Sequence, residues 1–170
     1  MKGGDIMGHY LNSLICLNGH LLSATHDDKY VNPNKYCRDC GEKIIDSCPS
    51  CSTKLKGKYK SDRPSTSAPK LYSYVPSYCH ECGNPYPWTE DKIKATEKLL
   101  ELEESISSEE LEYFSTNINS LMVDTPKTKV VATKLKLSLN KAGKEVASAI
   151  RDILVDIASE TAKKIIFPES

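Results

Sequence analysis

The chain reads CRDCGEKIIDSCPSC over residues 37–51, so two Cys-x2-Cys pairs lie within one short stretch. A two-residue gap lets a tight turn point both sulfurs at one metal ion. Two further pairs flank this stretch: Cys16 with His20 before it, and Cys79 with Cys82 after it. Tetrahedral zinc takes two such pairs, so the eight side chains predict two zinc ions in closed, structural sites.

The four pairs can combine in consecutive, nested or interleaved order. We favour the interleaved order, a cross-brace in which each ion joins two distant segments and the two ions replace a hydrophobic core. The nested order, in which the two central pairs share one ion, is the main alternative. The interleaved sites are Cys16, His20, Cys48 and Cys51 for one ion, and Cys37, Cys40, Cys79 and Cys82 for the other.

Three residues beside the cysteines support this interpretation. His20 is assigned as a ligand because without it Cys16 has no partner and one site lacks its fourth ligand; the alternative is an ordinary, partly exposed histidine. Gly41 and Gly83 directly follow the second cysteine of their pairs. A backbone that turns there through positive φ favours glycine.

We do not expect a secretory signal or a membrane-spanning segment in this sequence. Its first residues contain no uninterrupted apolar run before a cleavage site, as secretory signals do, and nowhere do about 18 apolar residues follow one another. We therefore expect a cytoplasmic protein. In a reducing compartment paired cysteines bind metals more often than they form disulfides, and an odd count of seven fits disulfides poorly.

Large core side chains are scarce, and charge is unevenly spread. Two Phe and one Trp leave few core anchors, for which bound metal would compensate. The net charge is zero, but residues 1–89 carry 11 Lys+Arg and 8 Asp+Glu (+3), residues 90–124 carry 3 and 10 (−7), and residues 125–170 carry 9 and 5 (+4). The acidic segment is a solvated face or, alternatively, a site for a basic partner.

We predict an α+β protein of two domains. Residues 1–89 form a small, β-rich zinc-ribbon or cross-brace module, and residues 90–170 form an all-α domain. Two short helices are expected near residues 90–104, after an N-cap at Thr89, and 108–121. The second begins with a capping-box pattern, in which Ser107 is followed three residues later by Glu110.

A third helix is predicted to begin at Thr125-Pro126 and to run for about 40 residues as far as Pro168. Apolar side chains recur along it at helical spacings, and Asn140 and Gly143 are the sites of any break. The apolar stripe must be covered by the preceding helices, by another subunit or by a membrane, and mixed charge on the polar side counts against a membrane. The candidate interaction face comprises Val146, Ile150, Ile153, Leu154, Ile157 and Ile165.

Several segments occur together in an unusual combination: CLNGH (16–20), YCRDCG (36–41), CPSC (48–51) and SYCHECGNPYPWT (77–89), followed by KAGKEVASAIRDILVDIASETAKKI (141–165). With them the chain resembles an uncharacterised family of small bacterial zinc-ribbon proteins with a helical C-terminal part. The resemblance spans about residues 14–167. It implies two zinc sites and a bacterial cytosolic setting, and it supplies no biochemical activity.

Two other patterns bear on binding. In PYPWT, Tyr86 and Trp88 are expected to seal the base of the zinc module, with an exposed peptide-docking surface as the alternative. A run of alternate lysines shares one face of any extended strand and, with a nearby arginine, could contact a phosphate backbone. The alternative is an edge strand protected by lysine. The candidate nucleic-acid contacts are Lys54, Lys56, Lys58, Lys60 and Arg63.

No phosphate-binding glycine loop, zinc-protease motif or activated nucleophile is found in the sequence, so we expect neither an enzyme nor a small-molecule substrate. We expect a non-catalytic adaptor with two Zn²⁺ ions. It would associate with itself or with an unidentified protein through the zinc module and the C-terminal helix. The alternative is a zinc-ribbon nucleic-acid binder, and a weaker one is an effector at a membrane surface.

Overall fold

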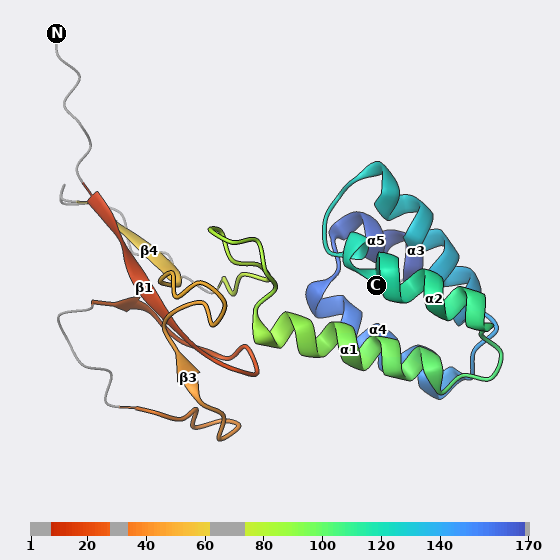
Figure 1. The fold of residues 1–170 in the computed structure, drawn as a ribbon, viewed down its shortest axis with the longest axis horizontal. Helices are drawn as coiled ribbons and strands as arrows, with labels where there is room; N and C mark the ends of the chain where they lie inside the picture. Colours follow the sequence, from red (N-terminus) through yellow and green to blue (C-terminus); the bar gives the residue numbers. More distant parts are fainter. Residues whose placement is uncertain (1–7, 28–33, 62–73, 169–170) are drawn as a thin grey trace, which may run out of the picture. The chain divides into compact units, whose positions relative to one another are not determined.

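The computed structural model describes residues 8–27, 34–61 and 74–168, and it divides the chain into two compact units, Met1–Trp88 and Thr89–Ser170 (Figure 1). The first, which we call the metal-bearing unit, contains a small antiparallel sheet and two clusters of cysteine and histidine side chains. The second, the helical unit, contains only helices among its described residues. The α+β class predicted from the sequence is confirmed.

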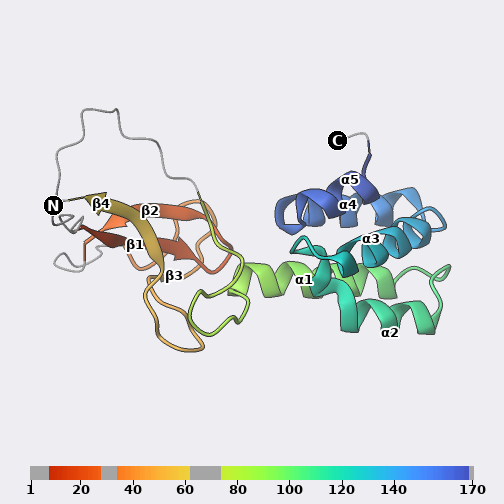
Figure 2. The ribbon, with the colours of Figure 1, turned by 90° about the horizontal axis from the view of Figure 1, so that it is seen from above.

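The sheet of the metal-bearing unit is built around one strand. Among the described residues this strand, β1, pairs in antiparallel fashion with each of the other three strands. Figure 2 shows the strands from a second direction. The strands are β1 (Gly8–Cys16), β2 (Leu21–His26), β3 (Ile44–Ile45) and β4 (Lys56–Ser61).

The short pairing between β1 and β3 gives this unit two small cores. Ile15 lies opposite Ile45, and Cys16 lies opposite Ile44. Successive side chains of a strand point to opposite faces. Ile15 and Ile45 therefore contribute to one buried cluster, and Cys16 and Ile44 contribute to another. The sheet thus separates two small clusters, each of which contains cysteines.

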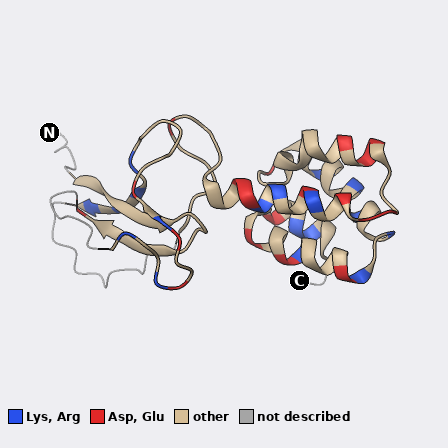
Figure 3. Ribbon diagram, turned by 60° about the horizontal axis from the view of Figure 1, so that its bottom comes forward, with Lys and Arg blue, Asp and Glu red and all other residues tan. Residues whose placement is uncertain are grey.

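The described residues of the helical unit form five α-helices and one 3₁₀ turn, and the first helix, α1, begins in the last residues of the metal-bearing unit. Lys92 of α1 bonds the carboxylate of Asp156 in α4 at 2.8 Å. Acidic and basic positions are interspersed along these helices (Figure 3). The elements are α1 (Pro87–Glu101), α2 (Ser108–Asn117), η1 (Ile118–Leu121), α3 (Pro126–Leu139), α4 (Lys144–Ile157) and α5 (Glu160–Ile166).

Helix starts follow the predicted capping signals in two places and differ in one. The capping box of Ser107 and Glu110 is present at α2, and Thr125 caps α3 with proline at its first position. Both predictions are confirmed. The first helix, however, begins at Pro87, so Thr89 lies inside it and is not its cap. Proline fixes φ at a helical value and needs no N–H bond at this position.

The long C-terminal helix predicted from the sequence is not continuous, because the segment contains three helices. The first break lies at the predicted site, between Asn140 and Gly143, and the N–H of Gly143 donates to the Glu103 carboxylate at 2.8 Å. The second lies at Ala158, which is extended (ψ 149). The Ser159 side chain then caps α5, and the N–H of Ser159 donates to the carbonyl of Leu121 at 2.8 Å. Bonds to distant residues therefore stabilise both breaks.

The predicted interaction face belongs mostly to the helical unit's own core. Ile150 and Leu154 are fully buried and Ile157 is nearly so. Val146 and Ile165 are partly buried and pack on the same core, and Ile153 is half-buried. The apolar stripe is covered by the other helices of this unit, so these residues do not form an exposed surface. No helix in the described part of the chain is long and apolar enough to cross a membrane.

Candidate metal centres

All eight predicted ligands gather in the metal-bearing unit, in two groups of four. Within each group the ligand atoms lie within 4.8 Å of one another. None of the cysteines forms a disulfide. The first cluster is Cys16, His20, Cys37 and Cys40, and the second cluster is Cys48, Cys51, Cys79 and Cys82.

The predicted interleaved order is wrong, because pairs that are consecutive in the sequence share each cluster. The turn that holds Cys37 leads directly into Ile44, which lies opposite Cys16 on the neighbouring strand. The chain then passes through Ile45, whose side chain packs in the other buried cluster together with Cys48. A strand of two residues therefore sends the second and third pairs to different sites.

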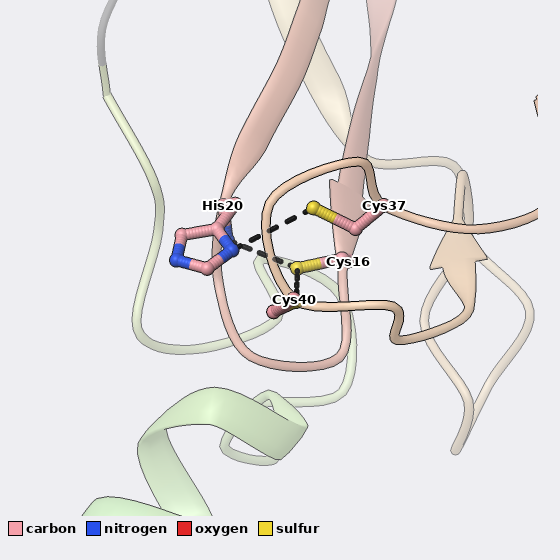
Figure 4. A group of neighbouring side chains, drawn as sticks. All are labelled: Cys16, His20, Cys37 and Cys40. Carbon is pink, nitrogen blue, oxygen red and sulfur yellow. Dashed lines mark hydrogen bonds between the residues drawn. The ribbon is translucent and has the colours of Figure 1, made fainter.

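In the first cluster, strand β1 and two turns bring the four side chains to one point (Figure 4). The sulfurs of Cys16 and Cys40 are 3.7 Å apart, and the Cys37 sulfur lies 3.6 Å from Nδ1 of His20. A tetrahedral zinc ion with Zn–S bonds of about 2.3 Å and Zn–N bonds of about 2.0 Å separates such atoms by roughly 3.8 and 3.5 Å. The arrangement fits a tetrahedral ion that is bound by three thiolates and one imidazole.

The second cluster has the same spacing with four sulfurs. Cys48 and Cys82 are 3.9 Å apart, and Cys51 and Cys79 are 3.7 Å apart, measured between sulfurs. A disulfide requires about 2.05 Å. These separations are those of thiolates around one ion. Cys82 is exposed and Cys51 is intermediate, while the other two are buried.

The three Cys-x2-Cys turns share one backbone design. In each, the N–H of the residue after the second cysteine donates to the carbonyl of the first, at 3.0, 2.8 and 3.0 Å. These residues, Gly41, Ser52 and Gly83, have φ values of 76, 63 and 72°. The positive φ predicted for both glycines is confirmed. Ser52 adopts the same conformation without being glycine, which the sequence did not indicate.

The turn between Cys16 and His20 is closed in a related way. The N–H of Gly19 donates to the Cys16 carbonyl at 2.8 Å, and the N–H of Cys16 donates to the His20 carbonyl at 3.1 Å. Gly19 has a φ of 85°, and a side chain there would come within 3.0 Å of Trp88. Both conformation and space therefore require glycine in the CLNGH segment.

Backbone amides prepare particular sulfurs to be anionic. Hydrogen bonds led by the N–H of Asp39 lower the pKa of Cys37 to about 7. Burial raises the pKa of Cys79, but the N–H groups of Cys82 and Glu81 outweigh it and lower this pKa to about 6. N–H groups that point at sulfur are the usual surroundings of metal-bound thiolates.

Cys82 shows the opposite effect. A backbone hydrogen bond from Asn84 lowers its pKa, but partial desolvation of the sulfur atom and the three neighbouring sulfurs outweigh that bond and raise the pKa to about 12. Four thiolates this close repel one another, so a proton is retained at this sulfur. A divalent cation removes that repulsion. The donor set therefore fits a metal ion better than it fits four free thiols.

Tyr86 and Trp88 lie beneath the second cluster, as predicted. Their rings stack at a centroid distance of 4.8 Å, and both are buried. The indole N–H of Trp88 donates to the carbonyl of Pro76 at 2.9 Å. They pack in the same cluster as Cys48 and Cys79. The alternative of an exposed docking surface at these two rings is wrong.

The predicted nucleic-acid contacts lie on or beside β4. Lys56 and Lys60 are exposed and Lys58 is half-buried, while Gly57 between them is buried. Lys54 precedes the strand and bonds the Asp46 carboxylate at 2.7 Å. Arg63 falls outside the described residues.

A group of tyrosines that the sequence did not single out for binding lies next to this strand. Tyr10, Tyr59 and Tyr74 line one pocket and are all exposed. Composition alone could have indicated this group, because the sequence has nine Tyr and only two Phe. Tyrosine keeps a polar group for contact with solvent or a ligand, and phenylalanine does not.

Fold and site together define a class: an α+β protein in which two four-residue cysteine and histidine clusters, each able to hold a metal ion, precede a helical unit. Residues 9–166 match a family described as an uncharacterized protein conserved in bacteria (DUF2321), and the chain belongs to this family. The resemblance inferred from the sequence is thereby confirmed. Comparison with curated proteins found no match, and comparison with solved structures found none.

Proposed function

We propose that this protein is a non-catalytic binding protein of the cytoplasm whose recognition surface is held in shape by two structural Zn²⁺ ions. The single observation that carries the proposal is the presence of two complete four-ligand clusters in one small unit. Metal supplies order there, and the surface around it is available to a partner.

Zinc is the ion that this donor set favours. Seven thiolates and one imidazole are soft and borderline ligands, which suit zinc and disfavour magnesium or calcium. Separations of 3.6 to 3.9 Å between ligand atoms correspond to tetrahedral geometry. Iron–sulfur chemistry also uses cysteine, but the imidazole of His20 in a closed three-cysteine set is typical of zinc.

The sites favour a structural over a catalytic role. Catalytic zinc keeps one position for water or substrate, whereas each cluster here offers four protein ligands. The buried apolar clusters of this unit are small and include cysteines themselves. Bound ions would therefore contribute folding free energy that burial of apolar surface does not supply.

The metal-bearing unit is also the better candidate for a recognition surface. The C-terminal apolar face, on which protein association through the helix would depend, is largely buried in the helical unit. Exposed aromatic and basic side chains occur together around β4 instead. This feature favours nucleic acid as a second candidate partner, beside a protein.

Native mass spectrometry tests the zinc assignment and the pairing. We expect two zinc ions per chain. Cys37→Ser and Cys79→Ser should each lose one ion, and the double variant both. Cys37→Ser with Cys16→Ser should lose only one, because both residues belong to the first cluster. A protein that purifies folded without zinc would contradict the proposal. Loss of both ions from the double variant with Cys16→Ser and Cys37→Ser would contradict the assignment of these two ligands to one cluster.

A further inference from the structure

The metal-bearing unit contains an aromatic pocket of about 410 Å³ that none of the predicted metal sites uses. Its volume lies in the range of small-molecule and base-binding sites. The residues on which the inference depends are Tyr10, Tyr59, Tyr74, Tyr78, Tyr86 and Lys56.

Three of the pocket's rings are exposed to solvent. Tyr10, Tyr59 and Tyr74 are 56%, 41% and 63% exposed. Tyr10 and Tyr59 face each other across β1 and β4, with centroids 5.2 Å apart in an edge-to-face arrangement. Aromatic rings gathered at a hollow surface offer flat apolar faces to a ligand.

The rim of the pocket is positively charged. The ammonium of Lys56 lies 5.5 Å from the centroid of the Tyr10 ring. Lys58 and Lys60 follow on the same strand but do not line the pocket. They flank Tyr59, so their side chains point to the opposite face of the sheet. No described residue that lines the pocket is acidic, and in the described ranges no carboxylate pairs with Lys56. The charge of Lys56 is therefore available to an anionic ligand.

The second cluster positions one wall of this pocket. Tyr78 directly precedes Cys79 and pairs with Pro85 across the cysteine turn. Tyr86 follows that turn, and its N–H donates to the Ser77 carbonyl at 3.0 Å. A metal ion at the second cluster would fix this turn, so the shape of the pocket depends on the ion.

We propose that the pocket binds single-stranded nucleic acid, with bases stacked on the exposed tyrosine rings and a phosphate held by Lys56; this inference rests on the proposed function, because zinc would shape the wall. Aromatic platforms beside basic side chains are the usual means of binding single strands. Duplex bases are already stacked and cannot use the rings. A proline-rich peptide could use the rings but has no negative charge for Lys56.

Fluorescence anisotropy with the two-zinc protein tests the inference. The probes are labelled oligothymidine and oligouridine of about 12 nucleotides and a duplex of the same length. We expect either single strand to bind more tightly than the duplex. For one phosphate contact, affinity should fall about 2- to 4-fold between about 50 and 200 mM salt. Equal or tighter binding of the duplex would overturn the stacking mode.

Matched variants identify the surface. Tyr10→Ala and Tyr59→Ala should each weaken binding by about 5- to 150-fold, the range for loss of one stacked base. Tyr36→Ala is the control, because Tyr36 is 63% exposed in the same unit but does not line the pocket. Lys56→Ala should reduce the salt dependence. Lys60→Ala, on the other face of the same strand, and Lys35→Ala should leave it unchanged.

Zinc content of every variant separates the two possible failures. A protein with two zinc ions that binds neither oligonucleotide would overturn this inference and leave the zinc proposal standing. Binding that survives both tyrosine changes, or a proline-rich peptide that binds this pocket in place of the oligonucleotides, would also overturn it. Absence of zinc from the folded wild-type protein would instead contradict the proposed function.

Discussion

The two units of this chain are ordered by different means. In the described part of the helical unit, 17 buried residues form one core. In the metal-bearing unit two clusters hold six and four buried residues, and four of these ten are cysteines of the candidate metal sites. One unit depends on buried apolar surface, and the other would depend on coordination.

This difference shows what each sequence pattern can tolerate. A large apolar core gains stability from many side chains, so single polar changes at its surface cost little. A unit with a small core depends on a few ligands and on the turns that present them. Substitutions and solution conditions should therefore affect the two units separately.

The largest single effect among the changes that leave the ligands intact is expected at Leu154. This residue is fully buried in the helical core. Leu154→Ala should lower the free energy of unfolding of the helical unit by about 2–5 kcal/mol, because it removes apolar contact and leaves a cavity. Thermal unfolding followed by circular dichroism measures this loss. The variant should keep two zinc ions per chain. Loss of zinc from this variant would show that the two units are not stabilised independently.

A smaller effect, on the order of 1 kcal/mol, is expected at Glu110. Bonds from the Ser138 hydroxyl and then the Ser107 N–H lower the pKa of this carboxylate to about 2, from an ordinary 4.5. A lowered pKa in the folded state stabilises the fold above the ordinary value, and this stabilisation is lost as the pH falls from about 4.5 towards 2.

Comparison with Glu110→Gln isolates the pH-dependent contribution of the Glu110 carboxylate to stability. Wild-type stability of the helical unit should fall more steeply than that of the variant below about pH 4.5, and the two should converge near pH 2. Chemical denaturation of both proteins at several pH values measures the difference. A constant difference between the two proteins across this range would contradict the assignment of the pH dependence to this carboxylate.

The smallest effect is expected at the metal-bearing turns. Ser52→Gly should stabilise the metal-bearing unit by about 0.5–1 kcal/mol, because relief of a left-handed conformation outweighs the added freedom of the unfolded chain. Gly41→Ser and Gly83→Ser are matched reversals, since no atom lies within 4 Å of a side chain added at either glycine. The zinc affinity of each of the three variants, measured by competition with a chelator, reports the change in stability. Stabilisation by either reverse change would contradict the account.

The ligands and several turn features could be predicted from the sequence because their determinants are local. The spacing of Cys79 and Cys82 restricts the turn between them, and Gly83 completes it. The capping box of Ser107 and Glu110 likewise acts over three residues. In each case the side chains that decide the geometry are neighbours in the sequence.

The pairing of the clusters could not be predicted, because it depends on two residues of β3. The register of Ile44 against Cys16 sends the second and third cysteine pairs to opposite faces of the sheet. The break at Ser159 depends on the carbonyl of Leu121, far away in the sequence. The tyrosine pocket likewise combines β1, β4 and the segment around Cys79. These features arise from tertiary contacts that no local pattern contains.

Zinc removal observed residue by residue tests whether metal coordination keeps the metal-bearing unit folded. Backbone amide NMR spectra would be recorded before and after an excess of a strong zinc chelator, with zinc loss verified on the same sample. We expect signals from the metal-bearing unit to collapse to unfolded positions while those of the helical unit keep their dispersion. A metal-bearing unit that stays folded after verified loss of both ions would contradict this expectation.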